Sequence, residues 1–197
     1  MKKYVGDLSL ADAALIERYA TRSLSVLEFG VGGSTQIIAQ SLQSAARFLT
    51  IDTNNDWITV TRSRLQKLGV ANRCQFITYK NWLKAVTGPF DLIFVDGVFS
   101  RRRAFAVRSW PLLAVGGFML FHDTRRSKDI ANVLAVIARN FEEIGAVHLN
   151  EPVGGKTSNI TTLQKKTREV RINWRRVEDR PEWMYGVGET PEEFWRQ

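Results

Sequence analysis

Apolar residues along the chain alternate between two spacings, which predicts alternating strands and helices. Short continuous apolar runs are typical of strands buried on both faces of a parallel sheet, and they fall at 25–29, 47–51, 75–79, 90–95 and 117–121. Apolar residues at helical spacing precede or separate these runs, at 8–19, 34–41, 56–68, 102–113 and 128–141. Two further short strands, at 146–149 and 160–163, flank a turn-rich loop, which favours an antiparallel pair.

This order predicts an α/β fold. We expect a doubly wound, Rossmann-like, mostly parallel seven-stranded sheet with helices on both faces and an antiparallel strand in a C-terminal hairpin, which we place at an edge. Residues 1–165 are expected to form a single domain. Residues 166–197 form a charged arm that contains Trp174, Trp183 and Trp195 and has no clear period.

The charge is positive and unevenly distributed. The 197 residues include 28 Lys and Arg against 20 Asp and Glu, a formal net charge of +8. Basic residues are concentrated at 99–128 and at 165–176, where they either bind an anionic partner or form an ordinary solvated surface. Because no nucleic-acid motif accompanies them, we favour the solvated surface and keep RNA association as an alternative.

Other features of the composition predict a cytoplasmic protein. The single cysteine, Cys74, excludes an internal disulfide and a cysteine-based metal cluster. No apolar run approaches the length of a membrane span, so we expect no membrane partner. The basic start at 1–4 is not followed by the apolar segment of a signal peptide.

Three glycines follow the first predicted strand and open the next helix. Gly30, Gly32 and Gly33 allow a tight turn and a close approach of a ligand to the helix N-terminus. Asp52 ends the second strand, about 20 residues further on, where a carboxylate can accept hydrogen bonds from a ribose diol. Together these residues predict a nucleoside-binding site.

A nicotinamide dinucleotide is one candidate for that nucleoside. The dinucleotide fingerprint has a third glycine where this chain has Thr35, and it gives Glu28 no role. We therefore rank an NAD-dependent oxidoreductase third among our hypotheses. An enzyme that uses a different cofactor ranks first, and a non-catalytic nucleotide-binding protein ranks second.

The motifs in their order resemble those of the class I S-adenosylmethionine-dependent methyltransferases. The similarity covers about residues 8–165 and is carried by 28–34, Asp52, 90–97, 116–123 and the closing hairpin. The resemblance implies S-adenosylmethionine as cofactor and S-adenosylhomocysteine as product. The residues it implies for cofactor binding are Glu28, Phe29, Gly30, Gly32, Gly33, Ser34, Asp52, Tyr79, Asn81 and Asp96, with Trp82 as a further candidate beside the adenine.

The subgroup that the chain resembles is catechol O-methyltransferase-like, or methyltransferase-24-like. Those enzymes bind magnesium through two acids and an Asn, and here Asp96 and Asp123 stand at the two acid positions but Thr124 replaces the Asn. Two carboxylates and waters would still leave room for magnesium. We nevertheless predict no metal ligands.

The resemblance implies O-methyl transfer to a small acceptor, and the arginines after the fourth strand suit an anionic one. Asp96, His122 and Asp123 are the candidate catalytic residues, with His122 either a general base or a helix cap. Arg101 and Arg102 would face an acceptor carboxylate or phosphate. The segment before the first strand is short, so we expect the arm or a second subunit of a homodimer to cover the acceptor site.

Overall fold

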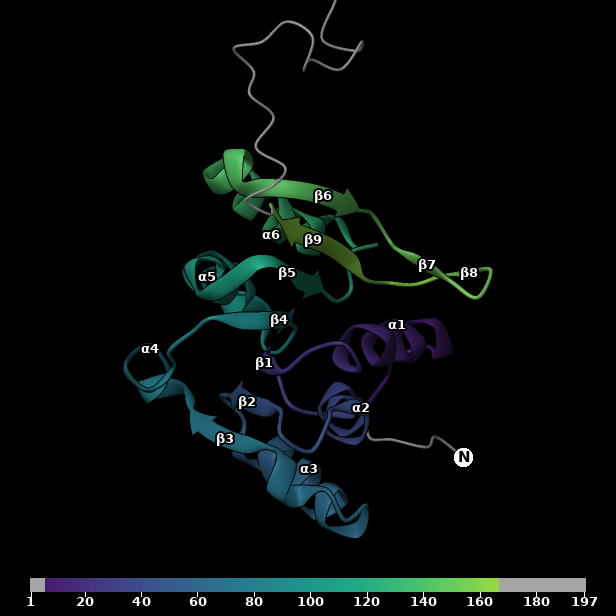
Figure 1. The fold of residues 1–197 in the computed structure, drawn as a ribbon, viewed down its shortest axis with the longest axis vertical. Helices are drawn as coiled ribbons and strands as arrows, with labels where there is room; N and C mark the ends of the chain where they lie inside the picture. The colour runs from purple at the N-terminus through teal and green to yellow at the C-terminus, as the bar shows by residue number, and fades with distance from the viewer. Residues whose placement is uncertain (1–5, 167–197) are drawn as a thin grey trace, which may run out of the picture. The chain divides into compact units, whose positions relative to one another are not determined.

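A seven-stranded sheet forms the centre of the molecule (Figure 1). The structure is a computed structural model that describes residues 6–166, so the arm predicted at 166–197 lies outside the described residues except for Lys166. The strands are β1 (Ser25–Phe29), β2 (Arg47–Asp52), β3 (Gln75–Thr78), β4 (Phe90–Val95), β5 (Leu113–Phe121), β6 (Ile144–His148) and β9 (Thr161–Lys165).

The strand order is β3-β2-β1-β4-β5-β9-β6. Neighbours from β3 to β5 are parallel, whereas β9 is antiparallel to both β5 and β6. The expected fold class is confirmed, but the expectation that the antiparallel strand lies at an edge is wrong. A helix connects β5 to β6, so β6 can run parallel to β5 without being its direct neighbour. The last strand, β9, runs in the opposite direction and lies between them.

Helices cover both faces of the sheet. Apolar residues of α1 (Leu10–Ala20), α2 (Gly33–Ser41) and α3 (Asn55–Lys67) pack with one side of the strands. The other side packs against α4 (Trp82–Ala85), α5 (Phe99–Ser109) and α6 (Ser127–Asn140). A separate hairpin of β7 (Pro152–Val153) and β8 (Lys156–Thr157) lies in the loop between β6 and β9.

The start of α1 follows the capping signal in the sequence. Ser9 accepts a hydrogen bond from the Asp12 amide, and the Asp12 carboxylate accepts one from the Ser9 amide, so two otherwise unpaired donors are satisfied. Asn54 caps α3 in a similar way, with its side-chain oxygen accepting from the amides of Asp56 and Trp57.

Between β4 and β5 the structure has a helix, but it begins and ends earlier than the predicted range 102–113. The helix α5 begins at Phe99 and ends at Ser109, and a single 3₁₀ turn, Trp110–Leu112, follows it. Pro111 lies in this turn, where it has no amide to continue an α-helix. The strand β5 therefore begins at Leu113, four residues before the predicted 117.

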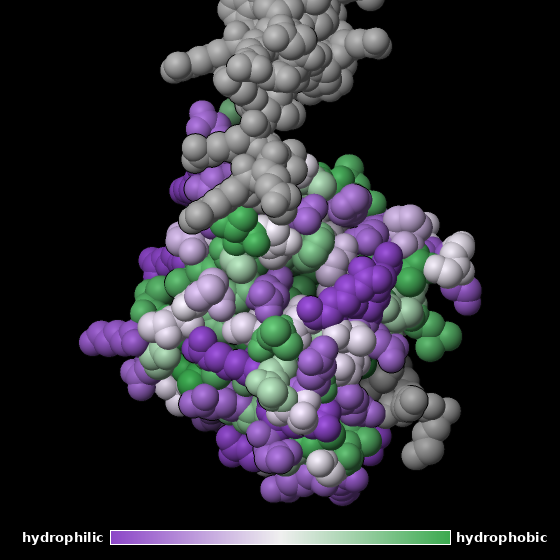
Figure 2. Space-filling model, in the orientation of Figure 1, coloured by the Kyte–Doolittle hydropathy of each residue, from purple (hydrophilic) through white to green (hydrophobic). Residues whose placement is uncertain are grey.

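Hydrophilic and hydrophobic residues are interspersed on the face of the molecule shown in Figure 2. Within residues 6–166, no helix combines the length and the apolar character that a membrane crossing requires.

The turns after β1 and β4 contact each other directly. Gly30 has a φ of 96°, and a Cβ added to it would lie 2.2 Å from the Gly97 amide nitrogen. Gly97 itself has a φ of 74°, with Gly30 Cα 3.1 Å from the position of its Cβ. Glycine is favoured at both positions for two reasons. The backbone has a positive φ, and the opposite turn lies too close for a Cβ atom to fit without displacement.

We predict that Gly30→Ala destabilises the protein by at least about 2 kcal/mol, through left-handed strain and the clash with Gly97. Gly69→Ala is the matched control, because Gly69 has a φ of 70° but nothing within 4 Å of its Cβ position, and we expect it to cost about 1 kcal/mol. Urea unfolding of both variants measures the difference. Equal losses would show that the close approach of the two turns does not limit stability.

Candidate functional site

A cleft of about 360 Å³ opens at the carboxyl ends of β1, β2 and β4. In open α/β sheets this is the edge where ligands bind. The cleft brings together the glycine turn, the second-strand acid and the fourth-strand acid that the sequence indicated. These predicted residues line it: Gly30, Gly32, Gly33, Ser34, Asp52 and Asp96.

Asp52 contributes to the shape of the cleft as well as lining it. One carboxylate oxygen accepts a hydrogen bond from the Val31 amide at 2.8 Å, and the other accepts from the Asn54 amide at 2.7 Å. The carboxylate therefore fixes the glycine turn and the start of α3 relative to each other. Each carboxylate oxygen has two lone pairs, so acceptor capacity remains for a ligand hydroxyl.

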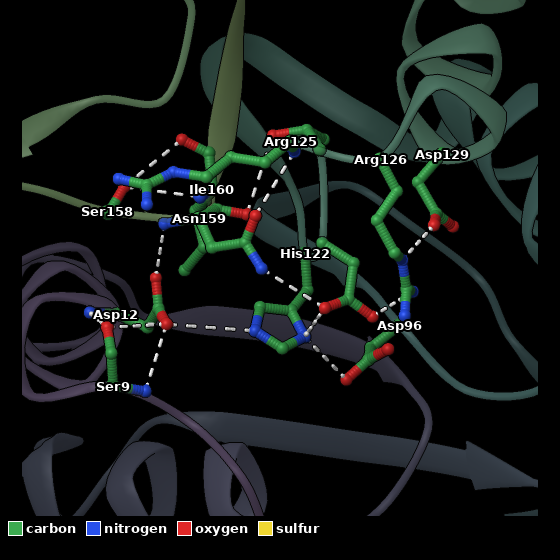
Figure 3. Close-up of polar contacts among 12 residues, drawn as sticks. Ser9, Asp12, Asp96, His122, Arg125, Arg126, Asp129, Ser158, Asn159 and Ile160 are labelled. Atoms are coloured by element: carbon green, nitrogen blue, oxygen red, sulfur yellow. Dashed lines mark hydrogen bonds and ion pairs between the residues drawn. The ribbon is translucent and has the colours of Figure 1, made fainter.

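Beside the cleft, His122 lies among carboxylates from three parts of the chain (Figure 3). Its Nδ1 is 3.2 Å from Asp96 Oδ2 and 3.7 Å from Asp123 Oδ1, and its Nε2 is 3.8 Å from Asp12 Oδ2. Asp96 lines the cleft, whereas His122 and Asp123 lie behind it. The three predicted catalytic residues are therefore adjacent, but a ligand in the cleft would meet Asp96 first.

The carboxylates determine the charge of His122. Burial alone would lower the pKa of the imidazole, but Asp12 and Asp96 raise it to about 10. Burial would also raise the pKa of Asp96, yet His122 and Arg102 hold it below its usual range. At neutral pH His122 is therefore an imidazolium and Asp96 a carboxylate.

A family model described as a methyltransferase domain matches residues 27–124, from β1 to the turn after β5. The chain carries a methyltransferase domain. The matched segment contains the glycine turn, Asp52, Asp96 and Asp123. No curated protein sequence matches the chain.

Solved structures share the fold of this methyltransferase domain. The O-methyltransferase TomG from Streptomyces achromogenes, in complex with SAM, is 20% identical with a TM-score of 0.63, covering 82% of each chain. An O-methyltransferase from Bacillus cereus, in complex with SAH, is 17% identical with a TM-score of 0.66, covering 81% of this chain and 83% of its own. An SAH-bound methyltransferase from Podospora anserina is 22% identical with a TM-score of 0.58, covering 78% and 77%.

Glu28 of the methyltransferase domain lies beneath the cleft and does not line it. The side chain is fully buried, and its carboxylate accepts hydrogen bonds from the hydroxyls of Ser34 at 2.5 Å, Thr35 at 2.7 Å and Thr50 at 2.6 Å. Thr35, which breaks the dinucleotide fingerprint, also accepts from the Gly32 amide at 2.9 Å. These contacts tie β1 to β2 and to the first turn of α2.

Three other predicted cofactor residues lie away from the cleft lining. Phe29 is fully buried and stacks on Phe105, with ring centroids 4.5 Å apart. Tyr79 packs edge-on against the same ring, and Asn81 is exposed beyond it. Trp82 is buried against Phe29 and is not available to stack on a base.

Several lining residues of the methyltransferase domain were not predicted. Trp57 lies on the first turns of α3 with 43% of its surface exposed, and it follows Asp52 by five residues. The signal in the sequence was an aromatic residue soon after Asp52, since an aromatic ring can stack on a base. The others come from the segment before α1 and from the turns after β1, β2 and β4: Gly6, Asp7, Leu8, Val31, Thr53, Asn54, Gly97 and Val98.

Glu28 predicts a pH dependence of stability. Burial raises its pKa from the ordinary 4.5 to about 7, so the folded protein holds the proton more tightly than the unfolded chain. The resulting stabilisation is complete below pH 4.5 and is lost as pH rises to 7, by about 3 kcal/mol.

Glu28→Gln removes this titration. We expect the free energy of unfolding of the variant, relative to the wild type, to increase by about 3 kcal/mol between pH 4.5 and pH 8. Urea unfolding across this range measures the difference. Parallel curves for the two proteins would mean that Glu28 keeps an ordinary pKa in the folded state.

Proposed function

We propose that the protein is an S-adenosylmethionine-dependent O-methyltransferase that acts on a small acceptor and releases S-adenosylhomocysteine. The observation that carries the proposal is the convergence of the glycine turn, Asp52 and Asp96 on one cleft of the methyltransferase domain. TomG in complex with SAM and the Bacillus cereus enzyme in complex with SAH support the choice of cofactor.

The cofactor's sulfonium group supplies the methyl group: its S–CH3 bond breaks, and the neutral sulfide of S-adenosylhomocysteine is the leaving group. The work left for the chain is to bind the nucleoside, to orient the acceptor and to exclude water. Asp52 is proposed to accept hydrogen bonds from the ribose hydroxyls. Trp57 offers an aromatic face to the adenine, in place of the residues predicted at the end of β3.

Asp96 is proposed to orient the acceptor. It is the one carboxylate of the His122 cluster among the residues that line the cleft, and it can accept a hydrogen bond from an acceptor hydroxyl. His122 is not suited to the predicted role of general base, because as an imidazolium it has no free lone pair. Its proposed role is to hold Asp96 in the charged form.

The acceptor side favours an anionic molecule. Val98 reaches the cleft, and the next residue, Phe99, is 48% exposed with the Lys128 ammonium 4.5 Å from its ring centre. Arg101 is exposed on the same turn of α5. An apolar or aromatic body with a carboxylate or phosphate fits this combination.

The other sequence-based expectations stay proposals. We propose a cytoplasmic enzyme and a homodimer. RNA association and an NAD-dependent oxidoreductase are the alternatives, and the calorimetry below distinguishes the oxidoreductase.

Calorimetry tests the cofactor. We expect S-adenosylmethionine and S-adenosylhomocysteine to bind the purified protein, and Asp52→Ala to weaken both about 100-fold, since two hydrogen bonds to a charged group are lost. Asp56→Ala is the control, because Asp56 is an exposed acid on the first turn of α3 outside the cleft lining. Binding of NAD in place of the sulfonium nucleosides would overturn the proposal.

A matched pair of probes tests the acceptor charge. With 3,4-dihydroxybenzoate and its methyl ester as acceptors, we expect Arg101→Ala to raise KM for the acid about 5- to 10-fold and to leave KM for the ester unchanged. Arg103→Ala, exposed on the same helix, is the control. An equal effect on both probes would contradict a charge contact with the acceptor.

A further inference from the structure

We propose that Arg102 is a built-in cation that takes the place of a divalent metal beside the cleft and positions Asp96 there. The sequence places Asp96 and Asp123 where catechol-type methyltransferases hold magnesium. In this chain a guanidinium group binds both acids. The inference concerns how the acids are neutralised, so it does not depend on the proposed methyl transfer.

Arg102 is buried, and each of its nitrogens has an acceptor. Nε donates to the Gly97 carbonyl at 3.0 Å, and one terminal nitrogen donates to the Asp96 carboxylate. The other lies 3.1 Å from Asp123 Oδ2 and 2.9 Å from Asp129 Oδ1. The planar guanidinium thus joins the turn after β4, the turn after β5 and the start of α6, which a compact ammonium could not reach together.

Every oxygen of the three carboxylates already faces a cationic or amide group of the chain. The second oxygen of Asp96 faces His122, and the second oxygen of Asp129 accepts from Arg126 at 2.6 Å. Asp123 accepts from Arg126 on the oxygen that faces Arg102, and from the Asn159 amide at 3.1 Å on the other. A divalent cation would have to displace these donors and lie against a positive guanidinium.

The third metal position is also lost. Thr124 is buried, and its hydroxyl is engaged by Asn150 and Thr161. Asp96, His122 and Asp123 have ligand atoms within 4.8 Å of one another, but an imidazole is a poor ligand for magnesium, which prefers oxygen. The residues present therefore do not fit the metal site of the subgroup.

The position of Arg102 explains why Asp96 can face the cleft. Asp96 is one-quarter exposed at its side chain, while Arg102 behind it is only one-tenth exposed. Arg102 is thus a positioning residue: it holds the Asp96 carboxylate from behind and leaves its open side to the ligand.

Titration with Mn²⁺ tests this inference without any assay of activity. We expect the wild type to bind no Mn²⁺ at this site, so that Asp96→Asn leaves its calorimetric trace unchanged at up to 1 mM ion. Arg102→Ala removes the cation that the three carboxylates share and leaves one oxygen of Asp96 and one of Asp129 without their Arg102 donor, and we expect it to bind Mn²⁺ at least tenfold more tightly than the wild type. Arg102→Lys keeps a positive charge and should restore the exclusion of the metal.

Two further variants locate the gained site. Arg103→Ala, the exposed neighbour on α5, should behave as the wild type. The double variant Arg102→Ala, Asp96→Asn should lose the Mn²⁺ binding that Arg102→Ala gains. If the role of Arg102 were purely structural, Arg102→Ala would lower stability but would not create Mn²⁺ binding that depends on Asp96.

The wild-type titration remains decisive if Arg102→Ala does not fold. Tight Mn²⁺ binding by the wild type that Asp96→Asn abolishes would overturn the inference, and so would a folded Arg102→Ala with no gain in affinity. Failure of the cofactor titration described above would leave the metal result unaffected, so the two proposals fail separately.

Discussion

The buried carboxylate of Glu28 is the contact on which the shape of the cleft depends. A charge at this depth is costly, and burial raises the pKa of Glu28. Hydrogen bonds from the hydroxyl groups of Ser34, Thr35 and Thr50 offset part of that cost. Because these hydroxyls belong to α2 and β2, the same contacts fix the glycine turn against its neighbouring strand. A residue that a ligand never touches therefore determines the surface on which the ligand lies.

Buried charged groups also position residues on the other side of the cleft, where the buried groups are cations. Arg102 and His122 surround the acids that end β4 and β5, and they hold Asp96 at the surface. In each case a buried ionisable group has several hydrogen-bond partners, and these contacts position a part of the cleft lining: the glycine turn in the first case and Asp96 in the second. Such networks are strong when every member is satisfied, and removing one partner leaves the others uncompensated.

This arrangement separates the methyltransferase domain from the magnesium-binding subgroup that its sequence resembles. Asp96 and Asp123 stand at the two acid positions, but their carboxylates bind the side chains of Arg102 and other residues of this protein. On this proposal the acceptor would be held by direct contacts with the protein. Val98, Phe99 and the cations around them provide a surface with that character.

The sequence by itself determined the succession of parallel strands along the chain up to β5, the glycine turn and Asp52, since apolar runs, glycines and terminal acids report local backbone structure. Only the tertiary structure decided that β9 lies inside the sheet, that Tyr79 and Asn81 are remote from the cleft, and that Trp57 lines it. It also decided that Arg102 points inward while Arg101 stays exposed. These outcomes depend on which side of a helix or strand faces which neighbour. Two adjacent arginines are the same residue type, so residue type alone does not show which of them points inward.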